Sequence, residues 1–173
     1  IYIGDGILIH PLIHGGGQEG GLRSGTENLP GIMGLGEAVL KVKEHMDMNV
    51  NPMYNLKSTL VEGILNKIPE AVINGPKVLE GAPHILNVSF PGIRAEVMLH
   101  ALEERGIYVS TGSACSSKRE NVSHVLKAIG AKKAEIEGAI RFSLSYMNTE
   151  EEMRVVPQIV SQVLEELKPF VRR

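Results

Sequence analysis

Two segments of the chain alternate apolar and polar residues, which is the period of a strand with one buried face. In residues 86–90, Leu86, Val88 and Phe90 alternate with Asn87 and Ser89. In residues 139–145, one side carries Ile140, Phe142 and Leu144, and the other carries Arg141, Ser143 and Ser145. Shorter strands are expected at 71–73 and 107–109, and two more on either side of a turn at Gly4–Gly6.

Between these strands, apolar residues recur at steps of three and four, which predicts amphipathic helices. The expected ranges are 29–46, 53–68, 95–104, 122–129 and 150–167. Asn28 is the expected N-cap of the first helix, and Asn121 that of the fourth. Because Pro52 closes the segment Asn49–Pro52, we expect it to separate the first two helices. Thr149 and Glu152 form a capping box for the last helix, which Pro157 is expected to kink or split.

The predicted fold class is therefore α+β, with a small antiparallel-type sheet covered by helices. A chain of 173 residues is long enough for one ordinary domain with its own hydrophobic core.

Composition limits the classes of binding partner and the cellular compartment that we expect for this protein. With 43% hydrophobic residues, 22% charged residues and a formal net charge of −2, the chain has the make-up of a soluble globular protein. Its charge indicates neither nucleic acid nor an anionic membrane as a partner, and no apolar run approaches a membrane span. One cysteine permits no internal disulfide, which fits a reducing cytoplasm. Six dispersed histidines and a lone cysteine do not indicate a metal site.

The single cysteine, Cys115, lies among the small polar residues of segment 109–121. A cysteine used for packing normally lies in an aliphatic run instead. Lys118 and Arg119 follow it, and nearby cations favour the thiolate, which is the nucleophilic form. We interpret the segment as an exposed, mobile loop that carries a reactive sulfur.

Arg141 is the candidate for binding a substrate, because the alternation places it on the polar side of its strand. A guanidinium fork is suited to holding a carboxylate through two hydrogen bonds. An exposed strand arginine in a surface ion pair has the same pattern, and the pattern alone favours that alternative.

The glycine-rich segment 14–28 suggests an anion site only weakly. His14 and the glycines after it match neither a P-loop nor a dinucleotide-binding motif, so a tightly turning loop is the default interpretation. Arg23–Thr26 places a cation, two hydroxyls and a glycine just before a helix, which suits a phosphate, but these are also ordinary capping residues. His124 is a candidate base for Cys115, although a surface histidine on a helix is the simpler interpretation.

Together, several of these segments resemble one family, the pyridoxal-phosphate-dependent cysteine desulfurases. Leu12–Glu19 and Leu22–Asn28 resemble the central stretch of that family, Ser113–Ser117 resembles its catalytic loop, and Ile140–Leu144 resembles its substrate-binding strand. The spacings suit the branch with the longer cysteine loop, within the class-V aminotransferase-like group. The resemblance covers essentially the whole chain.

The resemblance implies a role for three residues. Cys115 corresponds to the nucleophile that takes sulfur from L-cysteine as a persulfide and leaves alanine. Arg141 corresponds to the arginine that holds the substrate carboxylate. Thr26 corresponds to the threonine that contacts the cofactor phosphate of the neighbouring subunit, which implies a homodimer. A sulfur acceptor or iron–sulfur scaffold protein is then the expected partner.

The same resemblance implies how the chain is divided and what it lacks. Residues 1–29 correspond to the tail of a large cofactor-binding domain, 30–51 to a connecting helix and 52–173 to the small domain of a fold-type I enzyme. The family holds pyridoxal phosphate on a lysine in a Ser-x-His-Lys type segment, and the 173 residues contain no such segment. We therefore expect this chain alone not to desulfurate cysteine.

Two alternatives remain open at this stage. In the first, the chain is a non-catalytic module that accepts a persulfide on Cys115 or binds a scaffold. In the second, it is part of a related aminotransferase in which Cys115 is incidental. The first alternative leaves Arg141 and the Arg23–Thr26 segment without a task.

Overall fold

The computed structural model describes residues 1–111 and 123–170, which form two compact units, Ile1–Met46 and Asp47–Arg173. The second unit contains the sheet, made of β1 (Val72–Asn74), β2 (Ile85–Ser89), β3 (Ser110–Thr111) and β4 (Ala139–Ser143). The strand order is β1-β2-β4-β3, and every neighbouring pair is antiparallel. The α+β class with a small antiparallel sheet is confirmed.

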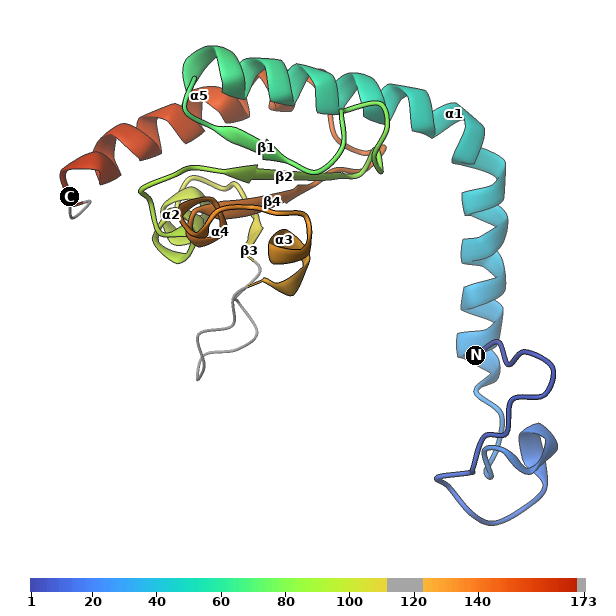
Figure 1. Cartoon of the computed structure of the whole chain (residues 1–173). Coiled ribbons are helices and arrows are strands. Elements are labelled where there is room, and N and C mark those ends of the chain that lie inside the picture. Colours follow the sequence, from blue (N-terminus) through green and yellow to red (C-terminus); the bar gives the residue numbers. More distant parts are fainter. Residues whose placement is uncertain (112–122, 171–173) are drawn as a thin grey trace. The chain divides into compact units, whose positions relative to one another are not determined.

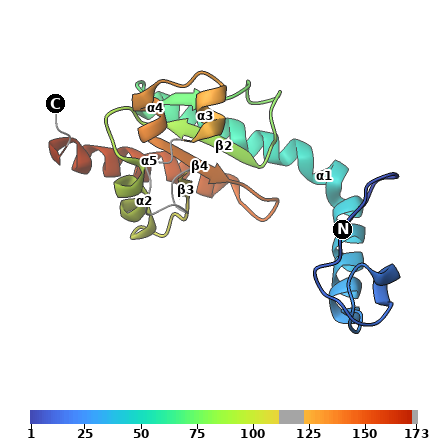
Figure 2. The ribbon, with the colours of Figure 1, turned by 60° about the horizontal axis from the view of Figure 1, so that its bottom comes forward.

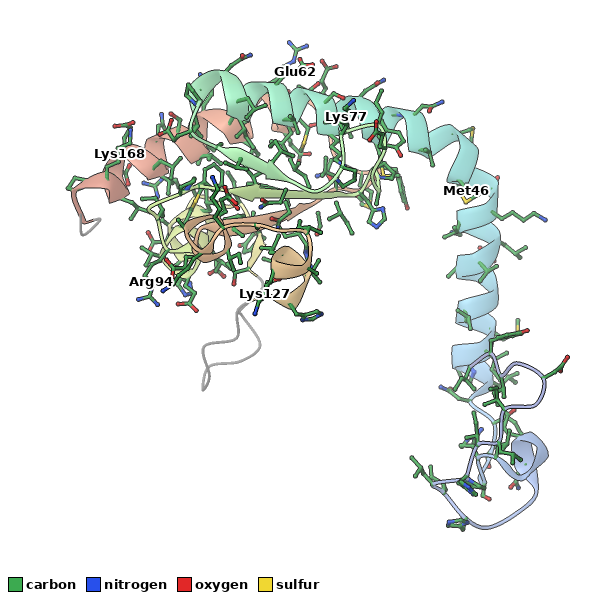
Figure 3. All side chains as sticks on the ribbon, viewed as in Figure 1. Met46, Glu62, Lys77, Arg94, Lys127 and Lys168 are labelled. Carbon is green, nitrogen blue, oxygen red and sulfur yellow. The ribbon has the colours of Figure 1, made fainter. Side chains whose placement is uncertain are left out.

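One face of this sheet forms one side of the hydrophobic core. Leu86 and Val88 of β2 lie opposite Phe142 and Ile140 of β4, and all four side chains are buried. They pack with apolar side chains of α2 (Ala95–Glu103), α5 (Glu150–Leu167) and the later turns of α1 (Leu29–Lys67). The alternation predicted from the sequence therefore corresponds to the core face of the sheet. Glu62, on the outer side of α1, points away from the sheet (Figure 3).

The later turns of α1 and helix α5 run side by side (Figure 1), and a glycine and a proline determine how closely they approach. Pro157 of α5 is fully buried, and a Cβ atom added to Gly63 of α1 would lie 2.6 Å from its ring carbon Cγ. Pro157 does not split α5, which runs from Glu150 to Leu167, so that part of the prediction was wrong. The proline ring forms part of the contact between the helices.

The predicted break at Asn49–Pro52 was also wrong, because α1 is a single helix from Leu29 to Lys67 with Pro52 inside it. A proline in a helix removes one hydrogen bond and crowds the preceding turn, which costs about 3 kcal/mol. Burial of Leu60 and Ile64, further along the same helix, opposes that cost. Tertiary packing therefore outweighs the local preference.

The opposite face of the sheet is partly covered by α4 (Lys133–Glu137), which the sequence analysis did not predict. The two views in Figures 1 and 2 place α4 and α5 on opposite faces of the sheet. Gly138, directly after α4, accepts a hydrogen bond from the backbone N–H of Phe90 (3.0 Å). A Cβ atom on Gly138 would lie 2.2 Å from the Phe90 carbonyl oxygen, so α4 approaches the end of β2 only because this residue is glycine.

Two further local predictions changed. The strand expected at 107–109 is displaced to Ser110–Thr111 in β3. The short helix α3 (His124–Ala128) is capped by Ser123, whose side chain accepts a hydrogen bond from Leu126 N at 3.3 Å. Asn121, the expected cap, lies outside the described residues. At the last helix, the predicted capping box of Thr149 and Glu152 is confirmed.

The first unit contains the early turns of α1 and a loop region with one 3₁₀ turn, η1 (Gln18–Gly21). The turn expected near Asp5 is present, with Ile7 N donating to Gly4 O at 3.2 Å, but the described residues before Gln18 contain no strand. Asn28 caps α1 by accepting a hydrogen bond from Gly31 N (3.2 Å), as predicted. The unit ends at Met46, which is labelled in Figure 3. The three-part domain division remains a prediction, and the structure divides the chain after Met46.

Candidate functional site

A row of polar residues crosses all four strands of the sheet. In the observed register Asn74 lies opposite Asn87, Asn87 lies opposite Arg141, and Arg141 lies opposite Ser110. Residues directly opposite one another on antiparallel strands share a face, with Cβ atoms about 4.5–5.5 Å apart. The row lies on the face opposite the core, so Arg141 is held between polar neighbours from β2 and β3.

The Arg141 side chain is exposed, and among the described residues it makes no hydrogen bond or ion pair. Other arginines of the same unit differ, since Arg105 contacts Glu166 at 2.5 Å and Arg154 contacts Glu150 at 2.5 Å. The surface ion pair considered for Arg141 is therefore absent within this part of the chain. No described acidic residue therefore competes with an external anion, such as a carboxylate, for its guanidinium.

Beside Arg141, a hydrogen-bonded network orders the polar face. Asn74 Nδ2 lies 2.6 Å from Asn87 Oδ1 and 2.6 Å from Ser89 Oγ. Ser89, which is fully buried, donates from Oγ to the carbonyl oxygen of Glu135 in α4 at 2.6 Å. The network thus joins strands β1 and β2 to α4. The sequence analysis placed Asn87 on the polar side of its strand but missed it as a site residue, because the pairing with β4 is not visible in the alternation.

Cys115, the predicted nucleophile, lies outside the described residues. The last described strand before Cys115 is β3, whose Ser110 lies opposite Arg141. The first described helix after Cys115 is α3, which is capped by Ser123 and begins at His124, an exposed histidine. The role of His124 as a base for Cys115 stays a prediction.

Thr26, the predicted phosphate ligand, lies in the first unit between Gly25 and the Asn28 cap of α1. Its side chain is exposed and makes no hydrogen bond to another described residue. Its carbonyl oxygen accepts a hydrogen bond from Arg23 Nη1 at 2.9 Å. The hydroxyl of Thr26 therefore remains available to a ligand.

The two residues that precede Gly25 bind the loop itself. Arg23 also donates to the carbonyl oxygen of Gly25 at 2.7 Å and lies 3.6 Å from the Glu19 carboxylate. Ser24, the one buried residue among those described in the first unit, donates from Oγ to Gly16 O at 2.7 Å. Gln18 Oε1 accepts from Gly25 N at 3.1 Å. Of the cation and two hydroxyls expected to meet a phosphate, only the Thr26 hydroxyl makes no hydrogen bond or ion pair to the described residues of the loop.

A groove of about 530 Å³ lies at the C-terminal end of β4, lined by Gly106–Tyr108, Phe142–Leu144 and the first turns of α5. Arg141 does not line it. Within the described ranges, no group of three or more His, Cys, Asp or Glu side chains could hold a metal ion. No helix in those ranges is long and apolar enough to cross a membrane.

Comparisons with known proteins identify the family of the chain. The family model described as aminotransferase class-V matches residues 10–156. The chain belongs to this family. Among curated class-V aminotransferase relatives, the cysteine desulfurase IscS of Clostridium botulinum strain Hall is 44% identical over 167 residues, covering 94% of this chain and 42% of its own length. Cysteine desulfurase IscS of Methanosarcina thermophila is 41% identical, covering 97% of this chain and 41% of its own.

Solved structures of class-V aminotransferase relatives give the same result. A NifS-like protein is 42% identical, with a TM-score of 0.80 over 96% of this chain and 42% of that one. A NifS-like protein from Rickettsia africae is 29% identical, with a TM-score of 0.77 over 92% of this chain and 41% of that one. The chain therefore spans less than half the length of the relatives it matches.

Proposed function

We propose that this chain forms part of a cysteine desulfurase, in which Cys115 accepts sulfur from L-cysteine and Arg141 holds the substrate carboxylate. The observation that carries the proposal is the 44% identity to a named cysteine desulfurase. That similarity accompanies a lone cysteine within a run of small polar residues and an arginine with no partner among the described residues. The role of each residue and the activity of the whole protein are parts of this proposal.

Strand register supports a shared site for Cys115 and Arg141. Ser110 lies directly opposite Arg141, and Cys115 follows Ser110 by five residues. Since an extended residue spans at most about 3.6 Å, the Cα atom of Cys115 lies within about 18 Å of the Cα atom of Ser110. Chain connectivity therefore permits Cys115 and Arg141 to contribute to one site.

The proposed reaction uses the Cys115 thiolate as a nucleophile toward the sulfur of the bound substrate. A sulfur–sulfur bond forms between them while the carbon–sulfur bond of the substrate breaks. The electron pair of that bond stays with the carbon skeleton, which takes up a proton and leaves as alanine. A persulfide remains on Cys115 for transfer to an acceptor. Arg141 orients the substrate by binding its carboxylate, which is not altered in the reaction.

Pyridoxal phosphate is the proposed cofactor, and it supplies an electron sink for the carbon skeleton when bound. The available Thr26 hydroxyl fits contact with its phosphate, whereas Arg23 and Ser24 are engaged within their loop. Thr26 is proposed to meet the cofactor of a second copy, so the working enzyme is a homodimer. The 173 residues contain no Ser-x-His-Lys type segment for the cofactor, so we expect no turnover by this chain alone.

The remaining parts of the proposal concern the cell. A persulfide on Cys115 needs a protein acceptor, and we propose a sulfur-transfer or iron–sulfur cluster assembly protein in that role. A single cysteine outside any disulfide suits a reducing compartment, so we place the protein in the cytoplasm.

A chimera tests the proposal. In the Clostridium botulinum cysteine desulfurase, the matching region is replaced by this chain, and sulfide and alanine released from L-cysteine are measured in the presence of a reductant. We expect turnover in the chimera, loss of sulfide release in Cys115→Ser, and full activity in the control Asn66→Ala, which changes an exposed residue of α1. Arg141→Gln is expected to raise KM for L-cysteine.

The alternatives give different results. If the Cys115→Ser chimera keeps its activity, Cys115 is incidental and the desulfurase proposal is wrong. If the chimera releases no sulfide but the 173-residue chain gains one sulfur atom on Cys115 from a persulfide donor, the chain is an acceptor module instead.

A further inference from the structure

In the hydrogen-bonded network beside Arg141, only one assignment of donors and acceptors is consistent. The Glu135 carbonyl oxygen can only accept, so Ser89 donates its hydroxyl hydrogen to it and accepts from Asn74. Asn74 must therefore present Nδ2 to Ser89, and its second N–H points to Asn87 Oδ1. Because hydrogen positions follow from such networks, the orientation of the Asn87 amide is determined as well. Asn87 accepts from Asn74 through Oδ1.

This direction leaves the other half of the Asn87 amide, Nδ2, with two hydrogens to donate. Among the described residues, Asn87 is an acceptor from Asn74, and its Nδ2 group donates no hydrogen bond. Asn87 lies directly opposite Arg141 on the same face of the sheet. The Arg141 guanidinium likewise donates no hydrogen bond to a described residue. Two groups that can only donate are therefore next to one another on adjacent strands.

We propose that Asn87 is a second ligand of the carboxylate that Arg141 binds, with Asn74 as the residue that positions it. A carboxylate has two oxygens with about four sites for accepting hydrogen bonds, so it can use both donors at once. Binding by a charged donor and a neutral donor from different strands also fixes the direction in which the substrate lies. This inference rests on the proposed carboxylate role of Arg141.

A purely structural role for Asn87 makes a different prediction. If Asn87 only completes the hydrogen bonds of Asn74, then its Nδ2 group is indifferent to a carboxylate ligand. An aspartate would then serve as well, because its carboxylate oxygen also accepts from Asn74. If Asn87 binds the substrate, however, Asn87→Asp replaces a donor by a like charge and repels the ligand.

The experiment is a titration of the ¹⁵N-labelled 173-residue chain with L-alanine, which carries the same carboxylate as L-cysteine without a thiol. The side-chain resonances of Arg141 Nε–Hε and Asn87 Nδ2–H₂ are followed by NMR. We expect both to shift with one common dissociation constant, and L-alanine methyl ester, which lacks the carboxylate, to shift neither.

Three variants sharpen the result. Asn87→Asp should weaken L-alanine binding by at least about tenfold, the loss expected for a hydrogen bond to a charged group together with added repulsion. Asn74→Ala should weaken L-alanine binding less, because Asn87 is still present but loses the contact that positions it. Asn66→Ala, an exposed asparagine on α1, is the matched control and should leave binding unchanged.

Each outcome decides the question. If Arg141 shifts while Asn87 does not, or if Asn87→Asp binds as tightly as the unaltered chain, the inference is overturned and the proposed function stands. If neither resonance shifts, both the inference and the carboxylate role of Arg141 are overturned. The shift of Asn87 in the unaltered chain tests the proposal even if a variant does not fold.

Discussion

Helix α1 behaves differently on the two sides of Met46. Before it, apolar side chains such as Ile32 and Leu40 are 51% and 64% exposed. After it, Leu60 and Ile64 are 1% and 0% exposed, because the sheet and α5 cover them. The residue types are the same in both stretches. An apolar residue on a helix thus contributes to stability only where another element removes it from water.

The largest expected difference comes from two isoleucines of this helix. Ile64→Ala removes three buried carbon atoms from the core and should lower the free energy of unfolding by about 2–5 kcal/mol. Ile32→Ala removes the same atoms from an exposed position and should change it by no more than about 0.5 kcal/mol. Urea denaturation followed by circular dichroism measures both. Equal losses in the two variants would contradict the division of α1.

Two glycines of the same helix should respond with opposite signs. Gly63→Ala places a methyl group 2.6 Å from the Pro157 ring, and this overpacking should destabilise the second unit by about 1–3 kcal/mol. Gly34 has no neighbouring atom within 4 Å among the described residues, so Gly34→Ala should raise helix stability by up to about 1 kcal/mol. Thermal unfolding of both variants is the measurement. A stabilised Gly63→Ala variant would show that α5 does not depend on this contact.

The smallest expected effect concerns the caps of α1 and α5. Only the cap of α5 should make the stability of the chain depend on pH. The backbone N–H of Thr149 first, and the Asn148 amide second, lower the pKa of Glu152 from its ordinary value of 4.5. A carboxyl whose folded-state pKa is lowered adds stability above the ordinary value. That contribution is lost as pH falls from 4.5 through the lower folded-state pKa. Asn28, the cap of α1, does not titrate.

Glu152→Gln should therefore remove part of the loss of stability that the unaltered chain shows below pH 4.5. Glu151→Gln is the matched control, because its neighbour Glu152 is the residue that reaches the cap. Unfolding curves recorded from pH 3 to pH 6 test this prediction. If both variants lose stability equally with acid, the cap is not the source of the effect.

The sequence predicted those elements whose signal is local. Alternation at Ile140, Phe142 and Leu144 predicted the buried face of β4, and Thr149 with Glu152 predicted the start of α5. Prediction failed where packing outweighed a local preference. Pro52 suggested a break in α1, yet the helix continues because its later turns are covered. Helix α4 was missed because it is a single short turn next to a glycine whose close approach to Phe90 is not visible in the sequence.

For the candidate site, the sequence alone identified the candidate residues: a lone cysteine among small polar residues, and an arginine on the polar side of a strand. Only the tertiary structure decided which residues lie beside that arginine. Asn87 and Ser110 lie opposite Arg141 because of strand register, which depends on contacts between residues far apart in the chain. The direction of the Asn87 amide depends in turn on Asn74 and α4. Residue type is encoded position by position, whereas a binding site requires the distances that only folding sets.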